Sequence, residues 1–369
     1  MKKVILSTMI ISSSLLSFGQ SAIKYPATKK IDKVDVYFGN SIPDPFRWLE
    51  DDRSAETAEW VKEQNKVTFD YLGAIPFRNT IKARMEKLWN YEKVSAPFKE
   101  GDYTYYYKNN GLQNQSVMYR KDAKGTEELF LDPNTFSKDA TTSLDGVSFS
   151  KDGSLVAYSI SEAGSDWRKV IFIDAKTKQS IGEPLVDVKF SGLSWKGNEG
   201  IFYSSYEKPK GSELSAKTDQ HRLFFHKLGT KQAEDAILFG DQEKRRYVGG
   251  YVSDDNRYLF ISAANSTSGN ELYLKDLSVP NSPIVAIHKG FEYDVDVLDN
   301  ICTTLFIVTN LKAPNKRIVT VDVANPGVEN WKDLIPETEQ VLNPSTGAGY
   351  IFANYMKDAV SVVKQFDYK

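Results

Sequence analysis

The chain has 369 residues, of which 41% are hydrophobic and 26% charged, a composition typical of a folded protein with a sizeable core. Its formal net charge is −2, and its one compact basic cluster is Lys244-Arg245-Arg246. This charge pattern argues against a nucleic-acid-binding or anionic-membrane surface, because both need concentrated positive charge. Aromatic residues make up 12% of the chain, which favours strands over helices.

Residues 1–20 have the pattern of a secretory signal peptide. Lys2 and Lys3 precede an apolar and hydroxyl-rich run, Val4–Leu16, and Ser17-Phe18-Gly19 then offers small residues at a cleavage position. The apolar run is too short to span a bilayer as a helix. We therefore expect the protein to be exported.

Two helices are expected within residues 21–90. Ser54 can cap the first helix, which should run to about Leu72 before Gly73 ends it. The second helix is expected over residues 78–89. Both carry apolar residues at helical spacing, which predicts that this N-terminal strap packs against another body of protein.

After residue 91 the pattern changes to short strands separated by turns. Phe149–Tyr158 is a hairpin built around Asp152-Gly153, a pair that readily adopts the positive φ angles of tight turns. Related segments occur at Leu193–Gly197 and Val252–Asn256, and their serines are 44 and 59 residues apart. These spacings bracket the roughly 40–50 residues of a four-stranded propeller blade. The sequence therefore predicts a β-propeller.

The strand pattern gives about five complete blades and the beginning of a sixth. The complete blades are expected near residues 98–131, 147–186, 190–239, 249–287 and 293–335. The chain ends soon after a strand-like segment at residues 358–367. An open ring would expose strand edges to solvent, so we expect residues 91–369 to be an incomplete, truncated propeller.

Five short motifs resemble those of the prolyl oligopeptidase (prolyl endopeptidase) family. They occur in the family's order, at Asp44–Asp51, Gly111–Gln115, Leu131–Asn134, Gly164–Trp167 and His226–Thr230. The resemblance implies a mainly β fold with a seven-bladed type of propeller, here cut to about five and a half blades. It also implies that the strap at residues 21–90 belongs to an α/β-hydrolase domain. With the export signal, it suggests a bacterial periplasmic member.

The family hydrolyses short peptides on the carboxyl side of proline with a Ser-His-Asp triad, and its propeller acts as a substrate-size filter. The triad lies beyond the propeller in the family, and this chain contains no Gly-x-Ser-x-Gly elbow. We therefore expect no catalytic residue here and no activity of the chain alone. The implied partners are short proline-containing peptides and the missing hydrolase domain. Family members are usually monomeric and use no cofactor.

The resemblance points to two candidate substrate-binding residues. Phe172 follows the Gly164–Trp167 motif where the family's propeller offers an aromatic side chain to the substrate, and Trp167 is a weaker candidate. The alternative for Phe172 is an ordinary core residue, because Val170 and Ile173 belong to the same buried-looking strand.

Other reactive side chains have structural interpretations. Cys302 lies in an apolar strand-like run, which predicts a buried thiol. We interpret His221 and His226 as strand-surface or core residues, and His288 as a residue beside a turn. The chain has no His-x-x-x-His or Cys-x-x-Cys motif, so no metal site is expected.

Two other functions remain open from the sequence. A stand-alone propeller that binds peptides or a partner protein is the main alternative. A non-peptidase enzyme that uses propeller carboxylates is weaker, because no paired acid and base stand out.

Overall fold

The computed structural model describes residues 23–209 and 218–369. The chain divides into two compact units, one ending at Arg84 and the other running from Met85 to Lys369. The predicted signal peptide at residues 1–20 lies outside the described residues. The division into a strap at residues 21–90 and a propeller at residues 91–369 stays a prediction. Within the described ranges, no helix is both long enough and apolar enough to cross a membrane.

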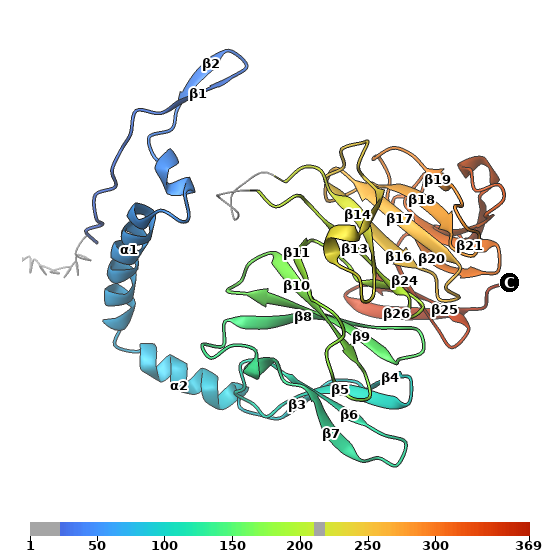
Figure 1. Cartoon of the computed structure of the whole chain (residues 1–369), viewed down its shortest axis with the longest axis horizontal. Helices are drawn as coiled ribbons and strands as arrows, with labels where there is room; N and C mark the ends of the chain where they lie inside the picture. Colours follow the sequence, from blue (N-terminus) through green and yellow to red (C-terminus); the bar gives the residue numbers. More distant parts are fainter. Residues whose placement is uncertain (1–22, 210–217) are drawn as a thin grey trace, which may run out of the picture. The chain divides into compact units, whose positions relative to one another are not determined.

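The N-terminal unit holds a hairpin and helical elements (Figure 1). Its elements are β1 (Val34–Tyr37), β2 (Asn40–Pro43), the 3-10 helix η1 (Arg47–Glu50), α1 (Ala55–Gly73) and the first part of α2 (Arg78–Trp89). The side chain of Ser54 caps α1 by accepting hydrogen bonds from the backbone N–H groups of Glu56 and Thr57, at 3.1 and 3.3 Å. Both predicted helices are therefore confirmed at their predicted positions.

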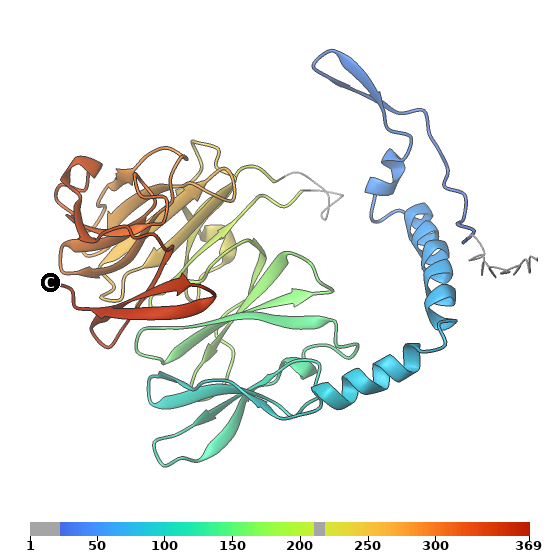
Figure 2. The same ribbon diagram turned by 180° about the vertical axis from the view of Figure 1, so that it is seen from behind.

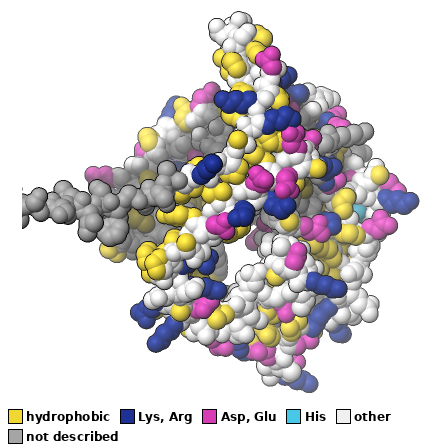
Figure 3. All heavy atoms as spheres, turned by 90° about the vertical axis from the view of Figure 1, so that its left-hand side faces the viewer, with side chains coloured by type: hydrophobic (Ala, Val, Ile, Leu, Met, Phe, Trp, Pro, Cys, Tyr) yellow, Lys and Arg dark blue, Asp and Glu magenta, His cyan; other side chains and the backbone are white. Residues whose placement is uncertain are grey.

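Large apolar side chains remain exposed on both helices. They are Val61, Phe69, Tyr71 and Leu72 on α1, and Ile81, Met85, Leu88 and Trp89 on α2. Hydrophobic side chains are drawn in yellow in Figure 3. The packing of these apolar stripes against another body of protein stays a prediction.

The rest of the described chain folds into six antiparallel sheets, the blades of a β-propeller (Figures 1 and 2). The first blade contains β3 (Lys93–Val94), β4 (Phe98–Glu100), β5 (Tyr103–Asn109), β6 (Val117–Lys121) and β7 (Glu127–Leu131), and β4 pairs with β5 beside β3. The second contains β8 (Thr142–Phe149), β9 (Leu155–Glu162), β10 (Trp167–Asp174) and β11 (Leu185–Lys189).

The next three blades repeat the plan of four consecutive strands. The third contains β12 (Ser194–Lys196), β13 (Gly200–Ser205), β14 (Arg222–Lys227) and β15 (Ala236–Phe239). The fourth contains β16 (Tyr247–Val252), β17 (Tyr258–Ala264), β18 (Glu271–Asp276) and β19 (Ile284–His288). The fifth contains β20 (Val295–Ile301), β21 (Thr304–Thr309), β22 (Arg317–Asp322) and β23 (Lys332–Ile335). Short 3-10 turns η2 (Pro133–Thr135), η3 (Gln232–Glu234) and η4 (Val328–Asn330) lie outside the strands.

The sixth blade corrects the predicted fold class. It contains β24 (Leu342–Gly347), β25 (Tyr350–Lys357) and β26 (Val360–Phe366), so the described residues form six blades. The prediction of a seven-bladed type with about five and a half blades was wrong. Its count missed β24, where Asn343, Pro344 and Ser345 disfavour a strand. Proline is tolerated there because β24 is an edge strand that pairs only with β25.

The predicted repeat has one geometry in two blades. In the second blade Ser150 Oγ donates to Asp152 Oδ1 at 2.8 Å and accepts from the N–H of Leu155 at 3.0 Å. In the fourth blade Ser253 donates to Asp255 at 2.5 Å and accepts from Tyr258 N–H at 2.9 Å. A serine and an aspartate thus satisfy the backbone of each turn, as their side chains commonly do.

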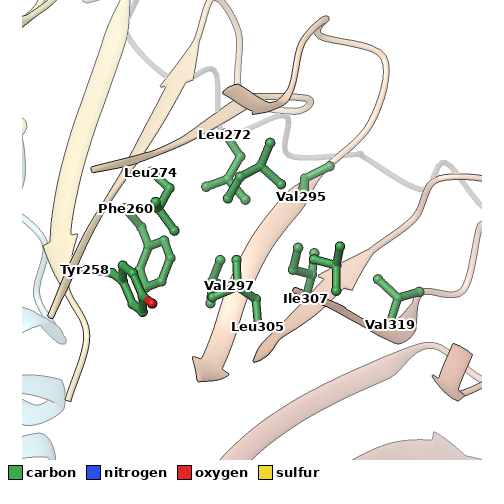
Figure 4. Close-up of a cluster of buried hydrophobic side chains, with 11 residues drawn as sticks. Tyr258, Phe260, Leu272, Leu274, Val295, Val297, Leu305, Ile307 and Val319 are labelled. Carbon is green, nitrogen blue, oxygen red and sulfur yellow. The ribbon is translucent and has the colours of Figure 1, made fainter. Parts of the chain in front are cut away.

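Hydrophobic clusters fill the spaces between consecutive blades. Five such clusters join the first blade to the second, and so on to the sixth, within the described residues. The largest packs the fourth blade on the fifth (Figure 4), through Tyr258, Phe260, Leu272 and Leu274 on one side and Val295, Val297, Leu305, Ile307 and Val319 on the other. Each such fully buried side chain stabilises the fold by about 1.5–3 kcal/mol relative to an exposed one.

Candidate functional site

Phe172 lies in the core between the second and third blades. Its side chain is 2% exposed and belongs to the hydrophobic cluster shared by those blades. The ring stacks on the imidazole of His226, with centroids 5.5 Å apart, and forms a T-shaped pair with Trp195. This position favours the alternative interpretation of Phe172 as a core residue, and its role in substrate binding stays a prediction.

A buried polar network supports that core. His226 Nδ1 is 2.9 Å from Asp235 Oδ1, and the hydroxyl of Tyr203 donates to Asp235 Oδ2 at 2.9 Å. Burial, together with the neighbouring carboxylate of Asp235, raises the pKa of Tyr203 above its usual range. His226 is 2% exposed, so the interpretation of this histidine as a core residue is confirmed.

Trp167, the second predicted residue, lies at the end of the second blade where its third strand, β10, begins. It is the first residue of β10, and Lys189, the last residue of β11, places its Nζ 4.9 Å from the centre of the Trp167 ring. Phe190 follows Lys189, Tyr206 follows β13, and Tyr247 begins β16. We call these five side chains, Trp167, Lys189, Phe190, Tyr206 and Tyr247, the Phe190 surface.

Phe190 is the most exposed aromatic residue of this surface. Its side chain is 50% exposed, although its ring centre is 6.2 Å from those of Tyr206 and Tyr247. Its φ angle is 54°, in the left-handed region that a phenylalanine rarely occupies. Asp187, three residues earlier, also has a φ angle of 54°. Strained backbone of this kind costs on the order of 1–3 kcal/mol and clusters at functional sites.

Cationic side chains surround the aromatic rings. Lys189 Nζ lies between the rings of Trp167 and Phe190, 4.9 and 5.1 Å from their centres. Lys208 Nζ is 5.7 Å from the centre of Trp167 and pairs with Asp187 at 2.6 Å. The surface can therefore offer aromatic faces to an apolar side chain and nearby N–H donors to a peptide carbonyl or carboxylate.

His221 connects the backbone around this surface. Its Nε2 donates to the carbonyl of Lys189 at 2.9 Å, and its Nδ1 accepts from the N–H of Val248 at 2.8 Å. The imidazole is fully buried and stacks on Tyr206, with centroids 4.3 Å apart. The interpretation of His221 as a core histidine is confirmed. Burial lowers its pKa to about 4, so the ring is neutral at neutral pH.

Sequence reasoning missed Phe190, although the sequence carries a signal for it. Phe190 is followed by Ser191 and Gly192, so a large aromatic residue stands among turn-forming residues. Tyr247 likewise follows directly after the Lys244-Arg245-Arg246 cluster. The structure thus brings Trp167 together with residues that were not predicted, and it leaves Phe172 in the core.

The thiol of Cys302 is exposed, which contradicts the expectation that it is buried. Cys302 lies in the turn between β20 and β21 with a φ angle of 53°. The apolar run that suggested one continuous strand is in fact divided by this turn. Among the described residues, no group of three or more His, Cys, Asp or Glu side chains is placed to hold a metal ion.

Sequence comparison places the whole propeller in one family. Residues 26–369 match the family model described as the N-terminal β-propeller domain of prolyl oligopeptidase. The chain is 57% identical over 349 residues to a prolyl endopeptidase of Elizabethkingia meningoseptica, covering 94% of this chain and 49% of that protein. It is 31% identical to prolyl oligopeptidase A of Amanita bisporigera, covering 85% of this chain and 46% of that protein. The chain thus spans about half the length of these relatives.

Comparison with solved structures gives the same family as comparison of sequences. One from a study of two prolyl endopeptidases, on inter-domain dynamics in catalysis and specificity, has a TM-score of 0.69 and 33% identity, over 93% of this chain and 50% of that one. Prolyl oligopeptidase B from Galerina marginata, bound to a 25-residue macrocyclization substrate, has a TM-score of 0.80 and 26% identity over 93% of this chain and 52% of that one. The chain belongs to the prolyl oligopeptidase family and matches its N-terminal β-propeller domain.

Proposed function

We propose that this chain is the propeller-bearing part of a serine peptidase that hydrolyses short peptides on the carboxyl side of proline. The observation that carries the proposal is the 57% identity to a prolyl endopeptidase over 94% of this chain, with only 49% of that protein covered. The remaining part of such an enzyme would supply the catalytic triad in an α/β-hydrolase domain. The exposed apolar stripes of α1 and α2 support this, since burying them needs a further body of protein.

In this proposal the Phe190 surface contacts the peptide. A half-exposed phenylalanine in a strained backbone conformation, beside Trp167 and Tyr247, offers flat apolar area to a substrate side chain near the proline. Lys189 and Lys208 lie close to these rings and carry N–H donors suited to peptide carbonyl groups. The proposal assigns recognition to the propeller and bond cleavage to an α/β-hydrolase domain.

Two measurements on the purified chain test the proposal. Ligand-observed NMR should detect binding of acetyl-Phe-Gly-Pro-amide, and weaker binding of acetyl-Ala-Gly-Pro-amide, which has no aromatic ring. A chromogenic proline peptide should not be hydrolysed by the chain alone. Turnover that persists through several orthogonal purification steps would contradict the division of labour, and equal binding of the two peptides would contradict the role of the Phe190 surface.

A stand-alone propeller that binds a peptide or protein partner is the second candidate. The hydrophobic clusters between consecutive blades, from the first to the sixth, favour it, because a core of this kind supports independent folding. A cooperative thermal transition together with a monomeric elution profile would support this candidate. Aggregation that is relieved by adding the hydrolase part of a relative would support the first.

We also propose that the protein is exported to the periplasm. The basic, apolar and small-residue regions of residues 1–20 support this. Expression in a Gram-negative host followed by fractionation should recover a processed chain in the periplasm, with a new N-terminus near residue 20. An unprocessed cytoplasmic chain would contradict it.

A further inference from the structure

One imidazole ties three consecutive blades together at the Phe190 surface. His221 directly precedes β14 of the third blade, its Nε2 donates to Lys189 at the end of the second blade, and its Nδ1 accepts from Val248 at the start of the fourth. The backbone N–H of His221 also donates to the carbonyl of Arg245 at 2.8 Å. One neutral tautomer, with the proton on Nε2, makes both ring hydrogen bonds.

The two backbone groups that His221 holds are adjacent to two aromatic residues of the Phe190 surface. Lys189 directly precedes Phe190, and Val248 directly follows Tyr247. The rings of Phe190 and Tyr247 come from different blades, and their centres are 6.2 Å apart at an interplanar angle of 55°. Fixing the carbonyl of Lys189 relative to the N–H of Val248 therefore restrains the spacing of these two rings. The left-handed backbone of Phe190 needs such a restraint, because it is not a conformation that phenylalanine prefers.

We propose that His221 is the positioning residue of the Phe190 surface, holding Phe190 and Tyr247 at the spacing that receives an apolar peptide side chain. The ligand class rests on the function proposed above. The positioning role rests on the two ring hydrogen bonds alone, so the two can fail separately. His221 itself is fully buried and acts through its neighbours without touching the ligand.

Two substitutions separate the hydrogen bonds from the volume of the ring. His221→Gln keeps one acceptor and one donor on a neutral side chain, whereas His221→Leu keeps apolar volume and removes both hydrogen bonds. We expect His221→Leu to weaken binding of acetyl-Phe-Gly-Pro-amide by about tenfold, the range for loss of an important contact at an interface. His221→Gln should restore most of this loss. Both variants are compared well below their own melting temperatures.

A double-mutant cycle tests whether His221 acts through Phe190. Phe190→Ala should weaken binding by a similar factor, and adding His221→Leu to it should weaken binding no further. If His221 had only a structural role unrelated to this surface, the factors by which the two substitutions weaken binding would multiply in the double variant. Multiplying effects, or equal affinities for the wild type and His221→Leu, would overturn the proposal.

A ligand-free readout keeps the positioning role testable if no peptide binds or if His221→Leu does not fold. In a chain labelled with 3-fluorotyrosine, the Tyr247→Phe variant assigns the Tyr247 resonance among the 20 tyrosines. Phe190→Ala should shift this resonance, because the neighbouring ring is lost. The Tyr247 resonance should be sharp in the wild type and shifted or broadened in His221→Leu. His221→Gln should change this resonance less than His221→Leu does. If His221→Leu does not fold, His221→Asn, whose shorter amide cannot span both partners, takes its place. An unaltered Tyr247 resonance in the variant that folds would overturn the proposal.

Discussion

Gly153 of the second blade is packed directly against Gly101 of the first. A Cβ on Gly153 would lie 2.3 Å from the backbone nitrogen of Gly101 and 2.6 Å from its Cα. Gly153 also has a φ angle of 71°, in the left-handed region. The Asp152-Gly153 turn therefore needs glycine for two reasons, its own conformation and the backbone of the neighbouring blade.

Gly153→Ala is expected to be one of the most destabilising substitutions in a turn of this protein. It adds a backbone clash to the left-handed strain, and backbone atoms cannot move aside as a flexible side chain can. Gly164→Ala is the matched control, because Gly164 has a φ angle of 74° and open space around it. We expect about 1 kcal/mol for Gly164→Ala and at least twice that for Gly153→Ala, measured by urea unfolding. Equal losses would contradict the packing of the two glycines.

The paired turn serines should behave alike. Ser150→Ala leaves the N–H of Leu155 without its acceptor, and Ser253→Ala does the same to Tyr258. Each substitution should lower the free energy of unfolding by about 1–3 kcal/mol, the cost of an unsatisfied buried donor. Ser278→Ala, at an exposed turn, is the control and should cost less. An effect at Ser150 without a matching one at Ser253 would contradict the repeated geometry.

His221 should make stability depend on pH. Its pKa is lowered to about 4 in the folded state by burial, against about 6.5 in an unfolded chain, so the folded state binds fewer protons. The stability it contributes is complete above pH 6.5 and is lost as the pH falls toward 4. The full loss is on the order of 3 kcal/mol, since one pKa unit corresponds to about 1.4 kcal/mol.

The measurement is urea unfolding of the wild type and His221→Gln between pH 7.5 and 4.5. Carboxylates contribute to both proteins, so the difference between them isolates the histidine. That difference should shrink as the pH falls. A difference that stays constant across this range would show that His221 is not buried as a neutral ring.

The thiol of Cys302 should react with Ellman's reagent in the native protein. The side chain is exposed, so one thiol per chain is expected to react without denaturant. Cys302→Ser provides the blank. Reaction of Cys302 only after unfolding would show that its thiol is buried in the native protein.

The sequence predicted the local structure of this protein better than its number of blades. The start of α1 and the Ser-x-Asp turns follow from side chains that satisfy nearby backbone groups, such as Ser54 and Ser150. The strand β24 was missed because Pro344 and its neighbours disfavour strands, while pairing with β25 holds them in one. Tertiary pairing overrode local preference, and that information is not local in the sequence.

The candidate site was less predictable for a related reason. Trp167 and Phe172 both lie on β10, yet one reaches the blade end and the other lies in the core between two blades. Phe190, Tyr206 and Tyr247 come from separate segments that only blade packing brings together. A sequence pattern can locate each aromatic residue but cannot tell which of them share a surface.

The most direct test of the central claim is the affinity of the purified chain and of Phe190→Ala for acetyl-Phe-Gly-Pro-amide, measured by ligand-observed NMR. The account predicts saturable binding to the wild type, about tenfold weaker binding to Phe190→Ala, and little difference between the proteins for acetyl-Ala-Gly-Pro-amide. Equal affinity of the two proteins for the phenylalanine peptide, or no binding by the wild type, would contradict it.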